Sequence, residues 1–523
     1  MGDHLVESRG MSDHTYAEGS GHLRQSASAS EHGRSWQEKY ELVVGLEVHA
    51  QLLTKTKAYS GIDNKYGDRP NTLVDEVTLG LPGTLPVPNT KAIDLAIRLG
   101  LACGCTIAPR MHYARKNYFY PDLPKGYQIT QDTTPICTGG KITIKDSAER
   151  GDGAGEIDIK ITRIHMEEDA GKSIHDVDPF NTLVDLNRAG VPLVEIVSEP
   201  DLRSSQEAYD YLVEVRRLVR YLDVCDGNME EGSLRCDANV SIRPKGSTTF
   251  GTRTEVKNLN SFKNVQRAIE YEAQRQSEVL DAGGTIHMET RTFDAAKGTT
   301  MGLRSKEMAH DYRYFPEPDI QPLTVSDAKK EAIRQAMPPL PRELRQKYTT
   351  TLGLSAYDAE ILTDDKDTAL YYEGVLLHTA NAKAAANWVM GDVRGWVNER
   401  GLTIQQFAIS ADRLASLVNL IDAGKVSHTI ASQKLFPLML DQPGTAEDLA
   451  TANGLLLDTR EDVIEIAVRE AMAKYPDKVQ AFRAGNKGLL GLFMGEVMKA
   501  TKGKADPRKA NELVVRMLEA TPK

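Results

Sequence analysis

The chain has 523 residues, of which 40% are hydrophobic and 26% are charged. This length exceeds what one hydrophobic core supports, so we expect about two to four domains. No uninterrupted apolar run approaches the roughly 20 residues that span a bilayer, which argues against a membrane protein. The net charge of −10 argues against indiscriminate nucleic-acid binding by the whole surface. The five cysteines form no CxxC pair, so the sequence predicts neither a disulfide framework nor a zinc knuckle.

The first segment, residues 1–36, is rich in Ser, Gly and His and shows no apolar periodicity. It lacks the hydrophobic core of a secretory signal, and its acidic residues argue against an organelle transit peptide. We predict a disordered extension here and a cytoplasmic location for the chain.

Residues 41–52 (ELVVGLEVHAQL) alternate apolar and polar side chains, which is typical of a strand with one buried face. Glu47, His49 and Gln51 share the polar face. Glu and His two residues apart on a strand project side by side and can chelate one hard divalent ion.

A second strand is predicted within residues 156–172 (EIDIKITRIHMEEDAGK), where the apolar alternation changes phase near Arg163. This change predicts a β-bulge or a strand end. Three acids follow, Glu167, Glu168 and Asp169. Such an acidic run alone is typical of a solvated turn, but here it joins other polar-faced strands that carry carboxylates.

Glu195 is a lone acid in the apolar run 191–197 (VPLVEIV). Burial of an unpaired carboxylate costs several kcal/mol, so we expect a cation or a hydrogen-bond donor beside it. A structural salt bridge is the alternative.

The strand predicted for residues 232–243 has Leu234, Cys236 and Ala238 on one face. The other face carries Arg235 and Asp237, together with Ser and Asn side chains. This mixture suits phosphate and metal chemistry better than a simple solvated face, which is the alternative interpretation.

The domains follow from the changes of periodicity. We predict an α+β domain over residues 37–323, with helices at 205–222 and 260–280 and a Pro-rich exit at 315–322. An all-α domain is predicted for 324–450 and a small helical tail for 451–523.

The tail has its own charge. Residues 475–523 contain ten Lys or Arg and five Asp or Glu, a balance of +5 that leaves −15 on the remainder. A solvated helix pair would explain this charge, and so would contact with a phosphate backbone. The cationic residues that cluster around one turn are Lys499, Lys502, Lys504, Arg508 and Lys509.

Several catalytic classes lack their motifs. The segment 170–173 (AGKS) resembles the end of a P-loop, but Met166 stands where the earlier glycine is required. We find neither a G-x-S-x-G elbow nor an H-E-x-x-H helix. ATP chemistry with carboxylate-held magnesium on an open sheet remains.

Seven blocks of the sequence resemble the GatB family, which forms one subunit of the tRNA-dependent amidotransferase. The resemblance extends from about residue 41 to the C-terminus. The blocks are GLEVHAQL (45–52), RKNYFYPDLPKGYQIT (115–130), HMEEDAGKS (165–173), VDLNRAGVPLVEIVSEPD (184–201), MEEGSLRCDANVSIRP (229–244), VKNLNSF (256–262) and DYRYFPEPD (311–319).

The resemblance implies a curved antiparallel sheet similar to glutamine synthetase and guanidino kinases, called the cradle. It also implies ATP-dependent phosphorylation of the side chain of Glu-tRNA(Gln), and in many organisms of Asp-tRNA(Asn), followed by amidation with ammonia. Because the sequence shows no glutaminase signature, we expect ammonia from a partner amidase (glutaminase) subunit, together with a small third subunit. ATP and Mg²⁺ are the implied cofactors. Some family members hold zinc with cysteine pairs, but residues 57–72 contain no cysteine, so we expect no structural zinc.

Transferred to this chain, the family motifs imply a site on the polar strand faces. The implied catalytic residues are Glu47, His49, Glu168 and Asp237, and the implied metal ligands are Glu47, His49, Glu167, Glu168 and Glu231. Phosphate contacts are expected from Lys172, Arg235 and Lys257. Two alternative functions remain, an ATP-dependent ligase for a free amino acid and a non-catalytic tRNA-binding scaffold.

Overall fold

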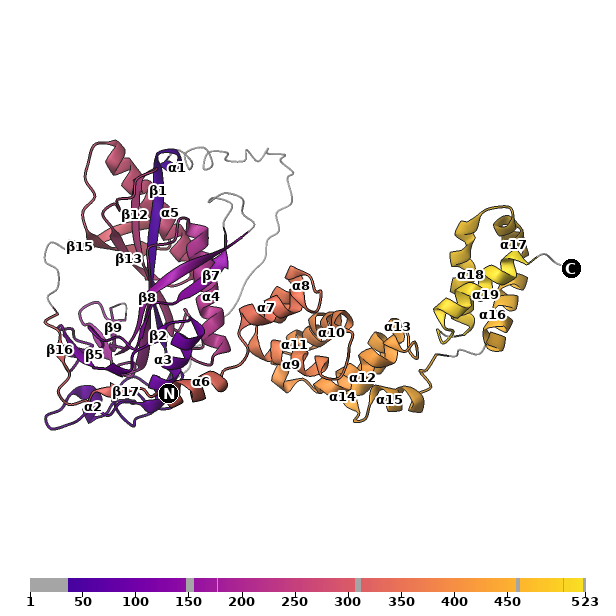
Figure 1. The fold of residues 1–523 in the computed structure, drawn as a ribbon, viewed down its shortest axis with the longest axis horizontal. Coiled ribbons are helices and arrows are strands. Elements are labelled where there is room, and N and C mark those ends of the chain that lie inside the picture. Colours follow the sequence, from indigo (N-terminus) through magenta and orange to yellow (C-terminus); the bar gives the residue numbers. More distant parts are fainter. Residues whose placement is uncertain are drawn as a thin grey trace, which may run out of the picture.

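The computed structural model describes residues 36–146, 155–175, 177–305, 312–457, 461–501 and 503–520, with the side chains of 304 and 305 excluded. Three hydrophobic clusters organise these residues (Figure 1). The first runs from Trp36 to Val325 and the third from Ile464 to Leu518. The predicted order, an α+β domain followed by helical regions, is confirmed. Of the predicted disordered extension, residues 1–35 lie outside the described residues, and Trp36 is buried at the start of α1 (Trp36–Lys39).

A ten-stranded sheet forms the framework of the first unit. Its pairings are antiparallel except that β13 and β14 run parallel, because α5 (Phe262–Asp281) returns the chain to the same end of the sheet. In spatial order the strands are β15 (Thr299–Ser305), β14 (Glu289–Asp294), β13 (Thr254–Leu259), β12 (Leu234–Pro244), β1 (Tyr40–Gln51), β11 (Pro192–Ser198), β8 (Glu156–Glu168), β6 (Cys137–Thr138) and β2 (Thr106–Ile107), and β7 (Lys141–Lys145) also pairs with β8.

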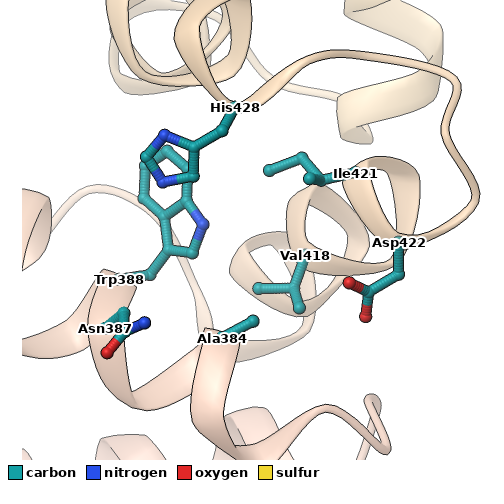
Figure 2. Close-up of a pocket in the computed structure, with 7 residues that line it drawn as sticks. All are labelled: Ala384, Asn387, Trp388, Val418, Ile421, Asp422 and His428. Atoms are coloured by element: carbon teal, nitrogen blue, oxygen red, sulfur yellow. The ribbon is translucent and has the colours of Figure 1, made fainter. Parts of the chain in front are cut away.

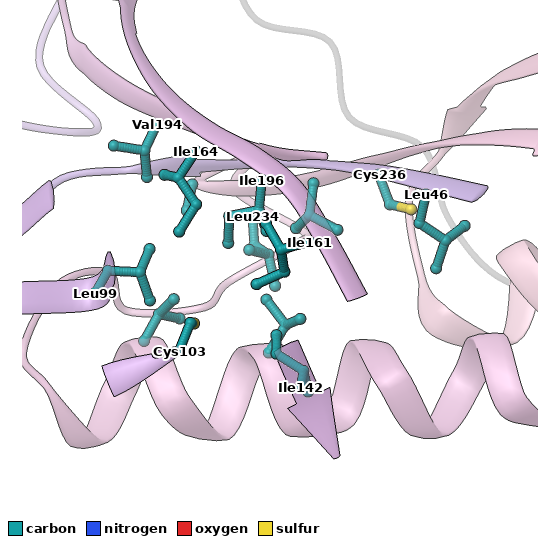
Figure 3. Packing of buried hydrophobic residues seen from close by; sticks show 14 of the residues in the cluster. Leu46, Leu99, Cys103, Ile142, Ile161, Ile164, Val194, Ile196, Leu234 and Cys236 are labelled. Atoms are coloured by element: carbon teal, nitrogen blue, oxygen red, sulfur yellow. The ribbon is translucent and has the colours of Figure 1, made fainter. Parts of the chain in front are cut away.

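The apolar face of the sheet packs against α3 (Thr90–Ala102), α4 (Ser205–Tyr221) and α5. Figure 3 shows Leu46, Ile161 and Leu234 among the buried side chains between the sheet and this helical layer. Each helix begins at a capping residue, for example Ser204, whose hydroxyl accepts from the N–H of Glu207 at 3.0 Å. This packing leaves the opposite face of the sheet to polar side chains.

Short strands and helices lie at the end of the sheet where β8 ends (Figure 1). One three-stranded sheet joins distant blocks of the sequence, because β16 pairs with β4 and β4 pairs with β5. The elements are α2 (Glu76–Leu79), β3 (Arg110–Met111), β4 (Ala114–Asn117), β5 (Tyr127–Thr130), β9 (Lys172–Ile174), β10 (Leu183–Asp185), β16 (Phe315–Pro316) and β17 (Leu323–Thr324).

The second unit is helical and touches the first through ion pairs. Lys145 pairs with Glu360 at 2.7 Å, and Arg342 pairs with Glu156 at 2.7 Å. Its helices are α6 (Asp327–Gln335), which packs against α3, then α7 (Pro341–Thr350), α8 (Ala356–Leu362), α9 (Lys366–Leu376), α10 (Ala382–Trp388), α11 (Arg394–Glu399), α12 (Ala411–Asp422), α13 (His428–Ile430), α14 (Phe436–Asp441) and α15 (Ala446–Ala452), with π-helical turns at Val389–Val393 and Ala431–Leu435 and a 3₁₀ turn at Ile404–Gln406.

The third unit contains α16 (Glu461–Lys474), α17 (Pro476–Arg483), a 3₁₀ turn at Lys487–Leu489, α18 (Leu490–Ala500) and α19 (Pro507–Glu519). Leu455 still belongs to the core of the second unit, so the two cores are separated at about residues 458–460. Among the described helices, none combines the length and apolarity needed to cross a bilayer.

Candidate functional site

The strand register brings three polar strand faces together in the middle of the large sheet. Glu47 lies opposite Asp237, and His49 lies opposite both Glu195 and Arg235. Directly opposite residues in an antiparallel pair share one face, so these side chains project to the same side. The polar face of β1 therefore continues into β11 and β12, as the alternation in the sequence predicted.

His49, Glu167 and Glu195 form the most compact group on this face. His49 Nε2 lies 3.2 Å from Glu195 Oε2 and 3.6 Å from Glu167 Oε1. One ligand atom from each residue lies within 4.8 Å of the others. The second oxygen of Glu167, Oε2, is buried and has no hydrogen-bond partner. A buried carboxylate oxygen without a donor suits a cation ligand, so these residues fit a hard divalent ion such as Mg²⁺.

The charges of this group depend on one another. Burial alone lowers the pKa of His49, but the hydrogen bond and charge of Glu195, with the charge of Glu167, raise it to about 9. Burial opposes ionisation of Glu195, yet its hydrogen bond with His49 and the charges of His49 and His165 hold the Glu195 pKa below its ordinary value. Burial lowers the pKa of His165, which lies 3.4 Å from Glu195.

A second group of carboxylates lies on the neighbouring strands. Lys257 Nζ pairs with Asp237 and, at 3.0 Å, with Glu255. Asn239 donates its amide N–H to Glu47 at 2.9 Å. Burial, followed by the charge of Glu195, raises the pKa of Glu47.

Arg235 is held at the edge of the polar face. Its guanidinium lies 2.7 Å from Asp169, which also accepts from Gln51 Nε2 at 2.9 Å. Burial opposes ionisation of Asp169, but Arg235 and Arg188 lower its pKa. The aspartate therefore fixes the guanidinium in place as a charged pair.

Of the residues predicted for this site, the structure brings Glu47, His49, Glu167, Arg235, Asp237 and Lys257 together. It does not bring Glu168, Glu231 or Lys172 to the group. Glu168 follows Glu167 on β8 and therefore points to the opposite side, where it pairs with Lys125 and accepts from the Ile129 N–H at 2.9 Å.

The other two residues are displaced along the chain. Glu231 is exposed in the turn before β12, and Lys172 is exposed on β9, in a separate two-stranded sheet. The geometry does not support their placement in this group from motif blocks, because residues close in sequence to a site residue need not share its face or its sheet.

Several site residues were not assigned to the site from the sequence. His165 and Glu195 complete the polar group, and Glu255 completes the pairing of Lys257. Lys116, from β4, also belongs to this environment, since Glu167 and Glu195 help to raise its pKa against the effect of burial. The available signal for His165 was its spacing of two residues before Glu167 on the same strand.

The predicted tRNA-binding residues gather at one end of the third unit. Lys499 lies in the last turn of α18, and Lys504 lies in the connection to α19. Arg508 and Lys509 begin α19, where the Asp506 side chain accepts from both of their N–H groups. These four side chains are exposed. Lys502 lies outside the described residues.

A separate cavity of about 70 Å³ lies in the second unit (Figure 2). Its lining includes Trp388 and His428, whose rings lie 5.3 Å apart, together with Val418 and Asp422. This cavity belongs to the helical second unit rather than to the large sheet, and its lining holds no carboxylate cluster comparable to that around His49.

Known proteins resemble this chain over most of its length. Residues 42–331 match the model of the GatB/GatE catalytic domain, and residues 370–518 match that of the GatB domain. A protein of Chlorobaculum tepidum is 50% identical over 481 residues, which cover 92% of this chain and 100% of the relative.

Relatives from other organisms show the same extent of similarity. A protein of Synechococcus elongatus is 49% identical over 92% of this chain and 98% of its own length. A protein of Solidesulfovibrio magneticus is 48% identical over 92% of this chain and 99% of its own length. All three are named as the B subunit of the aspartyl/glutamyl-tRNA(Asn/Gln) amidotransferase. With two domain models matched in order and half of the residues shared with such relatives, the chain belongs to the GatB family.

Proposed function

We propose that this chain is the component of a tRNA-dependent amidotransferase that phosphorylates the side-chain carboxylate of Glu-tRNA(Gln), Asp-tRNA(Asn) or both, using ATP. The observation that carries this proposal is the group formed by His49, Glu167 and Glu195, with one buried carboxylate oxygen left without a donor. The names of the relatives supply the substrate class. In that scheme the chain is part of a carbon–nitrogen ligase that takes its nitrogen from glutamine.

The residues of the polar face divide the work. His49, Glu167 and Glu195 would hold a divalent cation, which, when bound, neutralises charge on the oxygens of the transferring phosphoryl group. Arg235, fixed by Asp169, and Lys257, fixed by Asp237, provide positive charge on either side of β1. The pairing of both cations with carboxylates restricts their motion, as positioning of phosphate oxygens requires.

The reaction proceeds in two steps. An oxygen of the side-chain carboxylate attacks the γ-phosphorus of ATP, the bond to the bridging oxygen breaks, and ADP leaves. The nitrogen of ammonia then attacks the carbonyl carbon of the acyl phosphate, phosphate leaves with the electron pair of the C–O bond, and the nitrogen loses a proton.

The source of ammonia completes the proposal. The sequence carries no glutaminase signature, so we propose a separate amidase (glutaminase) subunit and a small third subunit as partners, within the cytoplasm. The relatives are each named as one subunit of their enzyme, which supports an assembly of several subunits.

The test is ATP turnover measured with charged tRNA, uncharged tRNA and free glutamate, in the presence of ammonium. The proposal predicts turnover that depends on charged tRNA. Turnover with free glutamate would favour the amino-acid ligase, and RNA binding without any turnover would favour the scaffold.

A further inference from the structure

A row of four tyrosine rings stands beside the polar face of the sheet. Tyr118 lies 6.2 Å from Tyr120 and 6.1 Å from Tyr312, and Tyr312 lies 5.8 Å from Tyr314, centroid to centroid. The rings meet edge to face, with interplanar angles of 67°, 70° and 67°. Two segments almost 200 residues apart in the sequence therefore build one aromatic surface, which we call the tyrosine row.

The chain holds this row in place with a strained backbone. Arg313, between two of the rings, has a φ of 44°, which is uncommon for a residue other than glycine. The Asn117 amide donates to the carbonyls of Tyr312 and Arg313 at 3.0 and 2.9 Å. Such local strain concentrates at binding and catalytic sites, where the surrounding contacts maintain it.

The tyrosine row is connected to the His49 group. The Tyr118 hydroxyl donates to Gln128 Oε1 at 3.0 Å, and Gln128 Nε2 in turn donates to the carbonyl of Glu168, the neighbour of Glu167. Lys116 places its ammonium 5.1 Å from the centre of the Tyr312 ring. The row therefore borders the place where phosphoryl transfer is proposed.

The outer rings of the row are open to solvent. Tyr120 is 59% exposed and Tyr314 is 41% exposed. Tyr120 also lines an open cavity of about 400 Å³, together with Phe119, Lys125 and Gly126. This volume falls within the roughly 300–1,000 Å³ of small-molecule sites. Exposed aromatic rings beside cationic groups are the means by which proteins stack nucleobases.

We propose that the tyrosine row is an adenosine subsite, on which an adenine ring stacks against Tyr120 or Tyr314. This inference rests on the proposed function, which supplies two adenosines, one in ATP and one at the 3′ end of tRNA. Both present the same planar ring, and both must reach the His49 group for the reaction to occur.

The test measures binding to the full chain of Mg-ATP, of inorganic triphosphate with Mg²⁺, and of an RNA minihelix that ends in CCA or in CC. The variants are Tyr120→Ala and Tyr314→Ala, with Tyr120→Phe and Tyr314→Phe as versions that keep the ring. Tyr357→Ala is the matched control, because Tyr357 is 73% exposed on α8 of the second unit.

We expect the Ala variants to weaken one adenosine ligand about tenfold or more, and the Phe variants to bind it as the parent chain does. Triphosphate binding stays unchanged, since it has no ring. Weaker binding of ATP alone identifies the adenine of ATP. Weaker binding of the CCA minihelix, with CC unaffected, identifies the terminal adenosine.

Folded Ala variants with unchanged affinity for both adenosine ligands would overturn the inference, even if they lose a partner protein. If an Ala variant loses its melting transition, Tyr120→Leu or Tyr314→Leu, which keep bulk without an aromatic ring, are measured in its place under the same criteria. A parent chain that binds neither ATP nor either minihelix would instead overturn the proposed function, and the inference with it.

Discussion

Two neighbouring glutamates on β8 have different environments. Glu167 joins His49 and Glu195 on the polar face, whereas Glu168 pairs with Lys125 on the other side of the strand. Strand alternation alone separates them, although both are acidic and buried. A substitution at one position therefore tests a different interaction from a substitution at the other.

At the residue scale, we predict that His49→Ala or Glu167→Gln lowers phosphorylation on the order of 10²-fold or more, while RNA affinity stays unchanged. The physical reason is the loss of a cation ligand in each case. Mn²⁺ binding, followed by electron paramagnetic resonance, should weaken in the same variants. Glu231→Gln, in an exposed turn, is the control and should retain both properties. Loss of the melting transition in place of activity would show a structural role.

A buried lysine permits a prediction about pH. Lys57 is 1% exposed and donates to the Leu73 carbonyl at 2.6 Å. Burial lowers its pKa to about 8, against the opposing charges of Asp75 and Glu168. The folded state therefore binds this proton more weakly than the unfolded state, so the contribution of Lys57 to stability increases as the pH rises from about 8 to 10.5.

The measurement is the free energy of unfolding of the parent chain and of Lys57→Met across this pH range. The difference between them should shift in favour of the parent by on the order of 3 kcal/mol. Below about pH 8 the difference should be constant. A difference that does not change with pH would show that Lys57 keeps an ordinary pKa.

At the scale of single elements, periodicity predicted much of the sheet. The helices predicted at 205–222 and 260–280 occur at Ser205–Tyr221 and Phe262–Asp281. The phase change near Arg163 is a β-bulge, because Val197 pairs with Arg163 whereas Ser198 pairs with Ile161. Short-range alternation determines such features, so they are visible in one sequence.

Other features depend on contacts between distant segments. The addition of His165 to the site requires the register of β8 against β11, which local sequence does not encode. The pairing of β4 with β16 joins residues that are about 200 positions apart. The parallel pair of β13 and β14 was likewise not predicted, since it depends on the path of α5.

The sheet of β16, β4 and β5 provides a prediction about stability. Arg115 of β4 donates to both carboxylate oxygens of Glu317 at 2.7 and 2.8 Å, and the Glu317 side chain is fully buried. Arg115→Met leaves a buried charge without its partner, which costs about 3–5 kcal/mol. Chemical denaturation should show this loss. The double variant Arg115→Met with Glu317→Met should recover part of it, and a double variant as unstable as the single one would contradict the argument.

At the scale of the whole molecule, the acidic cradle and helical unit are followed by a basic tail. Lys499, Lys504 and Arg508 lie at one end of the third core, on different elements from the strand faces that carry the His49 group. A surface of this kind can hold an RNA backbone without reading its bases. This separation predicts that binding and chemistry can be impaired independently.

We predict that deletion of residues 461–523, which retains Leu455 in the second core, raises the KM for charged tRNA far more than it lowers kcat. The dependence of RNA affinity on salt should become shallower, because fewer counterions are released. Kinetics and binding at several salt concentrations provide the measurement. An unchanged KM and salt slope, with the cradle still folded, would remove the tail from tRNA binding.

The central claim is that the side-chain carboxylate of the charged tRNA receives the γ-phosphoryl group of ATP on the polar face of the sheet. The most direct measurement uses Glu-tRNA(Gln) and Asp-tRNA(Asn) labelled with ¹⁸O in that carboxylate, with ATP and ammonium. We predict that the inorganic phosphate carries one ¹⁸O for each amide formed, and that Glu167→Gln forms neither product. Amide formation with unlabelled phosphate would contradict the claim.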